Sequence, residues 1–253
     1  MKTICITGAS SGIGEACAHE LAAQGHALIL CGRRADRLKI LRQHLETTYN
    51  TSVLDLELDV RYYKSCQEVV NRHEALFSKT DILINNAGLA AGLAPVHEGQ
   101  INHWDQMIDT NLKGLLYMSR LISPYMVKRK QGKIILIGSV AGKETYPNGN
   151  VYCATKHAVD ALARGMRMDL ISHGVQVSAI HPGMVETEFS MVRFDGDRER
   201  ANAVYNNMTP LKGIDVAKAV TWMIHSPEHV HIADVVIYPA VQASATIVNR
   251  SNS

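Results

Sequence analysis

Seven short runs of apolar residues recur along the chain, and stretches of helical length separate them. The runs cover residues 3–7, 27–31, 53–58, 81–85, 133–138, 175–180 and 235–238. Several are almost wholly apolar, as is typical of parallel strands that are buried on both faces. The stretches between them carry helical spacing, and Leu38, Leu41 and Leu45 form one such stripe. This alternation predicts right-handed βαβ units and an α/β fold with a doubly wound parallel sheet.

One stretch is less regular than the others. Residues 184–213 mix apolar side chains such as Phe189 and Phe194 with several charged ones. Ligands of open α/β sheets bind beyond the carboxyl ends of the strands, and this stretch follows the sixth strand. We therefore expect an insertion that closes over a substrate; a surface excursion with short helices is the alternative. No repeat or linker divides the chain, which predicts a single domain over residues 1–253.

Composition and charge argue against several classes of protein. The net charge is only +2, from 26 Lys+Arg against 24 Asp+Glu, so we expect no nucleic-acid partner. No run approaches the roughly 18 apolar residues of a membrane span, and we expect no membrane partner. Five cysteines without a CxxC pair argue against a disulfide framework and favour a cytoplasmic protein. His225, His229 and His231 lack a cysteine or a well-placed carboxylate, and we expect no metal site.

The loop after the first apolar run has the composition of a nucleotide-binding turn. Residues 7–14 read Thr-Gly-Ala-Ser-Ser-Gly-Ile-Gly, between a predicted strand and a predicted helix. Glycines allow a tight turn with backbone N–H groups close to a phosphate, and the following helix directs its positive end at a pyrophosphate. No Gly-Lys-Ser/Thr follows, which excludes a Walker loop. A tight turn without a ligand is the alternative. The residues expected to contact the dinucleotide are Gly8, Ser10, Ser11, Gly12, Ile13 and Gly14.

The end of the second run decides which nicotinamide cofactor is expected. An acid there would favour NAD by accepting from the ribose 2′-hydroxyl, but the chain reads Cys-Gly-Arg-Arg over residues 31–34. Guanidinium groups match a 2′-phosphate by paired hydrogen bonds. We therefore predict NADP, bound mainly through Arg33 and secondarily through Arg34. The alternative is that one or both arginines, Arg34 in particular, are solvated residues at the start of a helix.

Two further strand ends supply candidate cofactor contacts. Asp59 and Val60 close the third run, and the Asp59 carboxylate and the Val60 N–H are expected to hold the adenine. Asn86, Ala87 and Gly88 end the fourth run, and we expect them beside the cofactor. Since the carboxyl ends of parallel strands share one edge of the sheet, these positions converge with the glycine loop.

A tyrosine and a lysine at helical spacing are the candidate proton-transfer pair. Tyr152 and Lys156 are four residues apart, which places both side chains on one helix face. Tyrosine titrates near 10. An ammonium about 4 Å away would stabilise the phenolate by about 4 kcal/mol, enough to lower the tyrosine pKa by about two to three units. Ser139 follows the fifth run at the same edge, and Asn111 lies in the preceding long helix; these complete the predicted catalytic set.

Together these segments resemble the short-chain dehydrogenase/reductase family over nearly the whole chain. The resemblance implies a Rossmann fold whose seven parallel strands have the order 3-2-1-4-5-6-7. It further implies that Tyr152 is the acid/base and that Lys156 lowers its pKa and binds the ribose. Ser139 would position the substrate, and Asn111 would hold a water linking Lys156 to solvent. The motif after the sixth run adds implied cofactor contacts at Pro182, Gly183, Val185 and Thr187.

Three segments, residues 31–34, 150–152 and 187–194, are more closely similar to NADP-dependent serine/3-hydroxy acid dehydrogenases. That resemblance implies oxidation of L-serine, allo-threonine or 3-hydroxypropanoate, reduction of a semialdehyde in reverse, and a homotetramer. A 3-hydroxy acid needs a cation for its carboxylate, and Arg193 is the candidate. Arg193 could instead form a structural ion pair with Asp195 or Glu188, or contact the cofactor phosphates. The rival functions are an NADPH-dependent carbonyl reductase of bulkier ketones and an NADPH-binding protein without catalysis.

Overall fold

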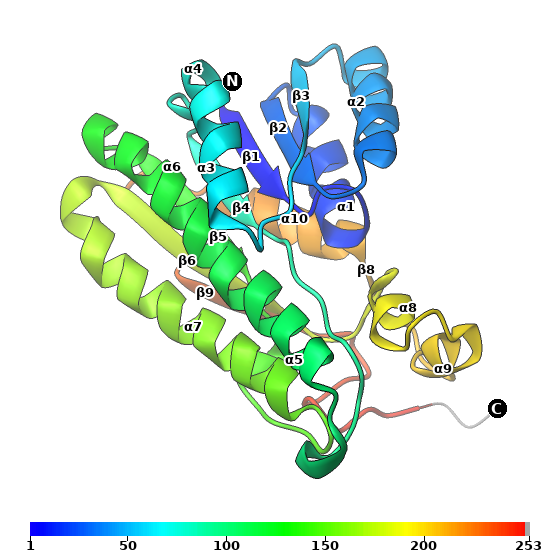
Figure 1. Cartoon of the computed structure of the whole chain (residues 1–253). Helices are drawn as coiled ribbons and strands as arrows, with labels where there is room; N and C mark the ends of the chain where they lie inside the picture. The colour runs from blue at the N-terminus through cyan, green and yellow to red at the C-terminus, as the bar shows by residue number, and fades with distance from the viewer. Residues whose placement is uncertain (251–253) are drawn as a thin grey trace.

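The computed structural model describes residues 1–250 and contains the predicted parallel sheet (Figure 1). Seven strands lie in the order β3-β2-β1-β4-β5-β6-β9, which is the predicted order 3-2-1-4-5-6-7 when the seven are numbered along the chain. All six strand pairings are parallel. The strands are β1 (Thr3–Thr7), β2 (Ala27–Gly32), β3 (Val53–Glu57), β4 (Ile82–Asn85), β5 (Gly132–Ile137), β6 (Val175–Pro182) and β9 (Asp234–Ile237).

The strands are apolar on both faces because helices cover both faces of the sheet. In β1, Ile4 and Ile6 belong to one buried cluster, whereas Cys5 between them belongs to a second. Successive side chains of a strand point to opposite faces, so each cluster is one layer of the core. A continuous apolar run therefore marks a central strand of this sheet.

Figure 1 shows the helices on the two sides of the sheet. The first layer contains α1 (Gly12–Ala22), α2 (Ala35–Tyr49) and α10 (Gly213–Ile224). The second contains α3 (Tyr63–Arg72), α4 (Glu74–Phe77), α6 (Leu115–Arg129) and α7 (Asn150–Leu170). No helix within residues 1–250 has the length and apolar character needed to cross a membrane.

The long helix expected around Asn111 has an interruption. Helix α5 (Ile101–Ile108) passes into a π-helical turn over Asp109–Gly114 before α6 begins. Such turns insert extra residues into a helix and are frequent at functional sites. The hydrophobic spacing of this segment did not indicate the turn, which is defined by the backbone hydrogen bonds of Asp109–Gly114.

The irregular segment after β6 contains a small second sheet. Strands β7 (Val185–Glu186) and β8 (Leu211–Lys212) pair in parallel, so the two ends of the segment meet. Between them lie α8 (Phe189–Arg193) and α9 (Arg198–Ala203), which project beside the carboxyl edge of the main sheet (Figure 1). The chain thus leaves and re-enters the main fold at one place, with two short helices held over that edge.

Candidate active site

A cleft of about 300 Å³ runs along the carboxyl edge of the sheet. Residues from the glycine loop, the strand ends, α7 and the segment before α8 line it together. Of the predicted site residues, Gly14 lies behind the loop, and Asn111 and Arg193 lie outside the cleft wall. The predicted residues that line the cleft are Gly8, Ser10, Ser11, Gly12, Ile13, Arg33, Arg34, Asp59, Val60, Asn86, Ala87, Gly88, Ser139, Tyr152, Lys156, Pro182, Gly183, Val185 and Thr187.

The glycine loop has the shape of a phosphate cradle. Gly8 has φ +66°, a conformation that few other residues adopt readily. A Cβ at Gly14 would collide with the Gly8 carbonyl, so the helix start packs directly on the loop. The Ser11 side chain makes no capping hydrogen bond to α1, which leaves the first N–H groups of that helix available to an anion.

Hydrogen bonds from the end of β4 hold this loop in place. The Asn86 Nδ2 group donates to the Thr7 and Gly8 carbonyls at 2.9 and 3.0 Å. The Thr7 hydroxyl accepts from the backbone N–H groups of Asn86 and Ala87 at 3.1 and 3.0 Å. Two of the predicted cofactor segments therefore form one hydrogen-bonded unit, and the residues present fit a dinucleotide pyrophosphate.

The two arginines after β2 have different surroundings. Arg33 is exposed at the rim of the cleft. Arg34 donates to the Ser10 and Ser11 hydroxyls at 3.2 and 2.5 Å and to Glu188 Oε2 at 2.7 Å. Arg34 does stand at the start of α2 with a side chain that is 41% exposed, but its guanidinium also links the glycine loop to the segment before α8.

Glu188 is a residue of this cleft that the sequence did not identify as a partner of Arg34. Its second oxygen accepts from Arg37 at 2.7 Å, so one carboxylate bridges two guanidinium groups. Hydrogen bonds from Arg34 and Arg37 lower the pKa of the Glu188 carboxyl below its usual value. The sequence suggests Glu188 only as a partner of Arg193, and helical spacing gives no signal for a contact across 154 positions.

The Asp59 carboxylate already has a partner within its own turn. Arg61 donates to it from Nε at 3.0 Å and from a terminal nitrogen at 2.6 Å. Burial acts to raise the pKa of Asp59, but the Arg61 hydrogen bonds outweigh it and lower the pKa. An adenine amino group at this place would share a carboxylate that Arg61 orients.

Tyr152 and Lys156 lie on the same face of α7, as the spacing predicts, and both are buried. The Lys156 Nζ donates to the Ile137 carbonyl at the end of β5 at 2.9 Å and lies 6.0 Å from the centroid of the Tyr152 ring. Burial lowers the pKa of Lys156 to about 8, because a charged ammonium is poorly solvated there.

The protonation behaviour of Tyr152 corrects one expectation. We expected Lys156 to lower the tyrosine pKa, but burial raises the pKa of Tyr152 above its usual value, and Tyr146 adds to the rise. A hydrogen bond with Ser139 and the positive charge of Arg193 act in the opposite direction. Arg193 is thus a second cation close to the Tyr152 ring, beside Lys156, and helical spacing could not indicate it.

Asn111 reaches the site through the loop after β4. Its amide accepts from the Leu89 N–H and donates to the Leu89 carbonyl, both at 2.8 Å. It also donates to the Thr155 hydroxyl at 3.1 Å. These bonds attach the π-helical turn and the loop to α7 between Tyr152 and Lys156. The role of Asn111 in holding a water stays a prediction.

The Arg193 guanidinium lies close to the ring of Tyr152. Its guanidinium carbon lies 5.5 Å from the ring centroids of both Tyr146 and Tyr152, and it donates to the Tyr146 hydroxyl at 2.6 Å. Within residues 1–250 it pairs with neither Asp195 nor Glu188, so the proposed structural ion pairs are wrong. A second cavity of about 200 Å³ begins here, with Tyr152 and Arg193 in its wall.

The buried ammonium of Lys156 is expected to lower the stability of the fold, although the proposed reaction needs it. We expect Lys156→Met to raise the free energy of unfolding at pH 7 by about 1–2 kcal/mol, because removing a desolvated charge outweighs the lost bond to Ile137. The unfolded lysine titrates near 10.5 and the folded one near 8. The wild type therefore gains stability as the pH rises from 8 to 10.5, and the advantage of the variant shrinks over that range. Urea unfolding of both proteins at pH 7 and pH 10 measures this; a less stable variant at pH 7 would contradict it.

The chain is similar in sequence and in structure to known dehydrogenases. The family described as short chain dehydrogenase matches residues 2–198. An NADP-dependent 3-hydroxy acid dehydrogenase, YdfG, of Salmonella typhi is 44% identical over 250 residues, covering 98% of this chain and 99% of the relative. An NADP-dependent 3-hydroxy acid dehydrogenase of Schizosaccharomyces pombe is 40% identical, covering 100% of this chain and 98% of the relative. A solved structure of the closed form of serine dehydrogenase with NADP+ has a TM-score of 0.91 and 41% identity, covering 99% and 100%.

Proposed function

The chain belongs to the short-chain dehydrogenase family, and on this premise we propose that it is an NADP-dependent oxidoreductase of small 3-hydroxy acids. L-serine, allo-threonine and 3-hydroxypropanoate are the proposed substrates, with semialdehyde reduction as the reverse reaction. The observation that carries this proposal is the Arg193 guanidinium 5.5 Å from the ring of Tyr152. In a 3-hydroxy acid the carboxylate is separated from the carbinol by a single carbon, so a cation must lie this close to the acid/base.

The residues of the cleft fit NADP. The N-terminus of α1 and the loop around Gly8 would hold the pyrophosphate, and Arg33 and Arg34 would hold the 2′-phosphate. The names of the relatives support the same cofactor. When bound, the nicotinamide exchanges a hydride with the carbinol carbon, and the protein supplies orientation and electrostatics.

The chain itself provides the proton transfer. Tyr152 takes the proton of the substrate hydroxyl during oxidation and returns it during reduction, since its side chain lines the cleft together with Ser139. Ser139 would donate a hydrogen bond to the reacting oxygen. Lys156, fixed by the Ile137 carbonyl, would bind the ribose and keep positive charge below the phenol.

A spectrophotometric assay tests the proposal. NADP+ reduction is measured with L-serine, D-serine, allo-threonine and 3-hydroxypropanoate, with NAD+ as the control cofactor. We expect reduction of NADP+ by at least one of the hydroxy acids. If all four fail while NADPH is oxidised by lipophilic ketones but not by malonic semialdehyde, the carbonyl reductase is the correct function.

The bridge through Glu188 predicts an effect on cofactor affinity. The Glu188 carboxylate neutralises Arg34, so a 2′-phosphate must compete with it. We expect Glu188→Gln to bind NADP about two- to fivefold more tightly, the range that a half-exposed ion pair allows, with little change for NAD. Titration calorimetry at low and high salt measures both affinities; a variant that gains equally for NAD would contradict the assignment.

We also propose an assembly and a location for the protein. A homotetramer is supported by large apolar side chains that are exposed on the single chain, among them Trp222 on α10 and Val236 on β9. We propose a cytoplasmic enzyme that is one domain over residues 1–253, with residues 184–213 as its substrate-binding insertion.

A further inference from the structure

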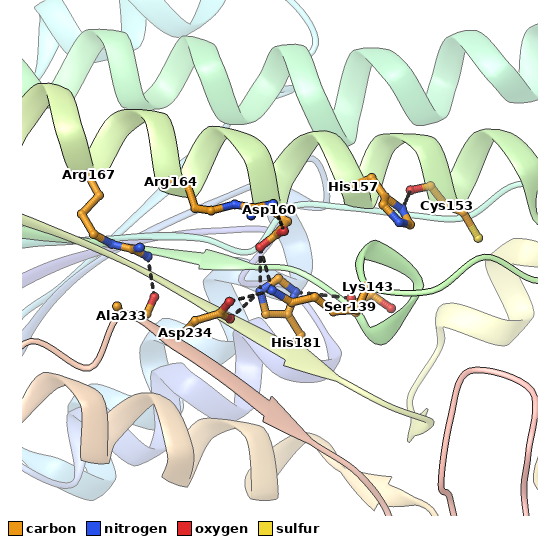
Figure 2. Close-up of polar contacts among 10 residues, drawn as sticks. All are labelled: Ser139, Lys143, Cys153, His157, Asp160, Arg164, Arg167, His181, Ala233 and Asp234. Atoms are coloured by element: carbon orange, nitrogen blue, oxygen red, sulfur yellow. Dashed lines mark hydrogen bonds and ion pairs between the residues drawn. The ribbon is translucent and has the colours of Figure 1, made fainter.

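Four ionisable side chains from separate segments meet behind the turn that carries Ser139. Figure 2 shows Asp160 extending from α7 toward His181 of β6 and Asp234 of β9. The Lys143 Nζ donates to Asp160 Oδ1 at 2.8 Å and to Asp234 Oδ2 at 2.6 Å. His181 Nε2 lies 2.9 Å from Asp234 Oδ1, and its ring is fully buried. We call these four residues the Lys143 cluster.

The Lys143 cluster contains a possible metal-ligand set, but its charges favour another role. Potential ligand atoms of Asp160, His181 and Asp234 lie within 4.8 Å of one another. Lys143 already bridges the two carboxylates, and Arg164 adds a second positive charge at 2.6 Å from Asp160. Burial lowers the pKa of His181, so its ring is neutral at pH 7. Two anions thus face two cations, and a divalent ion would have to displace Lys143.

The Lys143 cluster touches the Ser139 turn at two points. His181 Nδ1 lies 3.3 Å from the Ser139 carbonyl, and Lys143 directly follows the short 3₁₀ turn over Val140–Gly142. Within the turn, Ser139 accepts from the Ala141 N–H through its hydroxyl at 3.1 Å. The position of the catalytic hydroxyl therefore depends on the backbone that the cluster holds.

The same turn rests directly on the catalytic helix. A Cβ at Gly142 would collide with the Lys156 carbonyl, so the turn and α7 pack backbone to backbone. Asp160 is one helical turn beyond Lys156 and two beyond Tyr152, and these three residues share one face of α7. A tether from Lys143 to Asp160 therefore fixes the turn relative to the helix that carries Tyr152.

We propose that Lys143 is a positioning residue, whose ammonium, held by Asp160 and Asp234, seats the Ser139 turn on α7 and sets the spacing between Ser139 and Tyr152. The inference rests on the proposed function. A small displacement of a positioned group lowers the rate without weakening the binding of distant parts of the ligands. Loss of the tether should therefore lower kcat and leave NADP binding intact.

Three variants test this role. Lys143→Met removes the tether, Lys143→Arg retains the positive charge, and Arg164→Met removes a cation from the same Asp160 on the solvent side, away from the turn. We expect Lys143→Met to lower kcat about tenfold with an unchanged NADP dissociation constant, Lys143→Arg to recover most of that rate, and Arg164→Met to match the wild type. Hydrogen exchange of the peptide over residues 138–145 should accelerate only in Lys143→Met.

The outcomes separate this role from general stability and from the proposed function. Equal losses of kcat in Lys143→Met and Arg164→Met, or an unchanged kcat in a folded Lys143→Met, would overturn the positioning role. If Lys143→Met does not fold, Asp234→Asn weakens the same tether from its exposed end and carries the same expectations. A wild type that oxidises no hydroxy acid refutes the proposed function instead, while the exchange rates of the turn still decide whether Lys143 holds it.

Discussion

Tyr152→Phe is expected to reduce kcat for 3-hydroxy acid oxidation by about 10³-fold or more, with little change in NADP affinity. A positioned acid/base contributes about 10²–10⁴-fold, and the phenylalanine keeps the ring while removing the group that carries the proton. The ring lies edge-on to Phe189 at 5.6 Å, a contact that survives the substitution. Stopped-flow measurement of NADPH formation, with separate titration of the cofactor, distinguishes the chemical step from binding.

Tyr146→Phe is the matched control for this prediction. Tyr146 is a half-buried tyrosine of the same region, and its hydroxyl accepts from Arg193 while its side chain does not line the cleft. We expect a loss of less than about tenfold, since only the orientation of Arg193 changes. Comparable losses in the two variants would show that the proton passes through neither phenol specifically.

Arg193→Met is expected to lower kcat/KM for 3-hydroxypropanoate by about 100-fold. A charge-assisted pair that a ligand carboxylate loses inside a pocket amounts to about 3 kcal/mol, and each 1.4 kcal/mol corresponds to tenfold. An uncharged analogue such as 1,3-propanediol should lose far less, since it has no carboxylate to pair. Steady-state kinetics with both substrates measure the difference.

Arg200→Met is the control for that experiment. Arg200 lines the same second cavity, but its guanidinium lies 4.5 Å from the Phe194 ring. We expect kcat/KM within about threefold of the wild type, as for a charge that is not paired with the substrate. If Arg193→Met lowers kcat/KM equally for the acid and for the diol, Arg193 supports the fold of α8 and does not bind the substrate carboxylate.

Arg193→Met should also change the pH dependence of the oxidation rate. The Arg193 charge lowers the pKa of Tyr152, so its removal raises that pKa. Oxidation requires the deprotonated phenol, and the alkaline rise of the oxidation rate should therefore move to higher pH in Arg193→Met. A pH–rate profile that keeps the wild-type midpoint would show that the guanidinium does not act on the phenol.

Much of the fold was predictable because its signals are local. Ile4 and Ile6 alternate with Cys5 in a run apolar throughout, which indicates a strand covered on both faces. The cleft residues from Gly8 to Thr187 were predictable for a related reason, since they follow strands whose carboxyl ends must share one edge. The spacing of Tyr152 and Lys156 placed both on one helix face, as observed.

The contacts that set the chemistry could not be found in this way. Arg193 contacts Tyr152, Glu188 contacts Arg34, and Lys143 contacts Asp234. The two residues of each pair are far apart in the sequence, so no helix or strand periodicity relates them. Burial contributes more to the pKa of Tyr152 than any neighbouring charge does. The sequence by itself determined a parallel α/β fold of the dehydrogenase family and predicted a catalytic set. Only the tertiary structure decided that Arg193 also faces the Tyr152 ring and that Lys143 contacts Asp160 and Asp234. Hydrophobic period and strand-end position specify where the backbone goes, whereas charged side chains pair according to distances that exist only after folding.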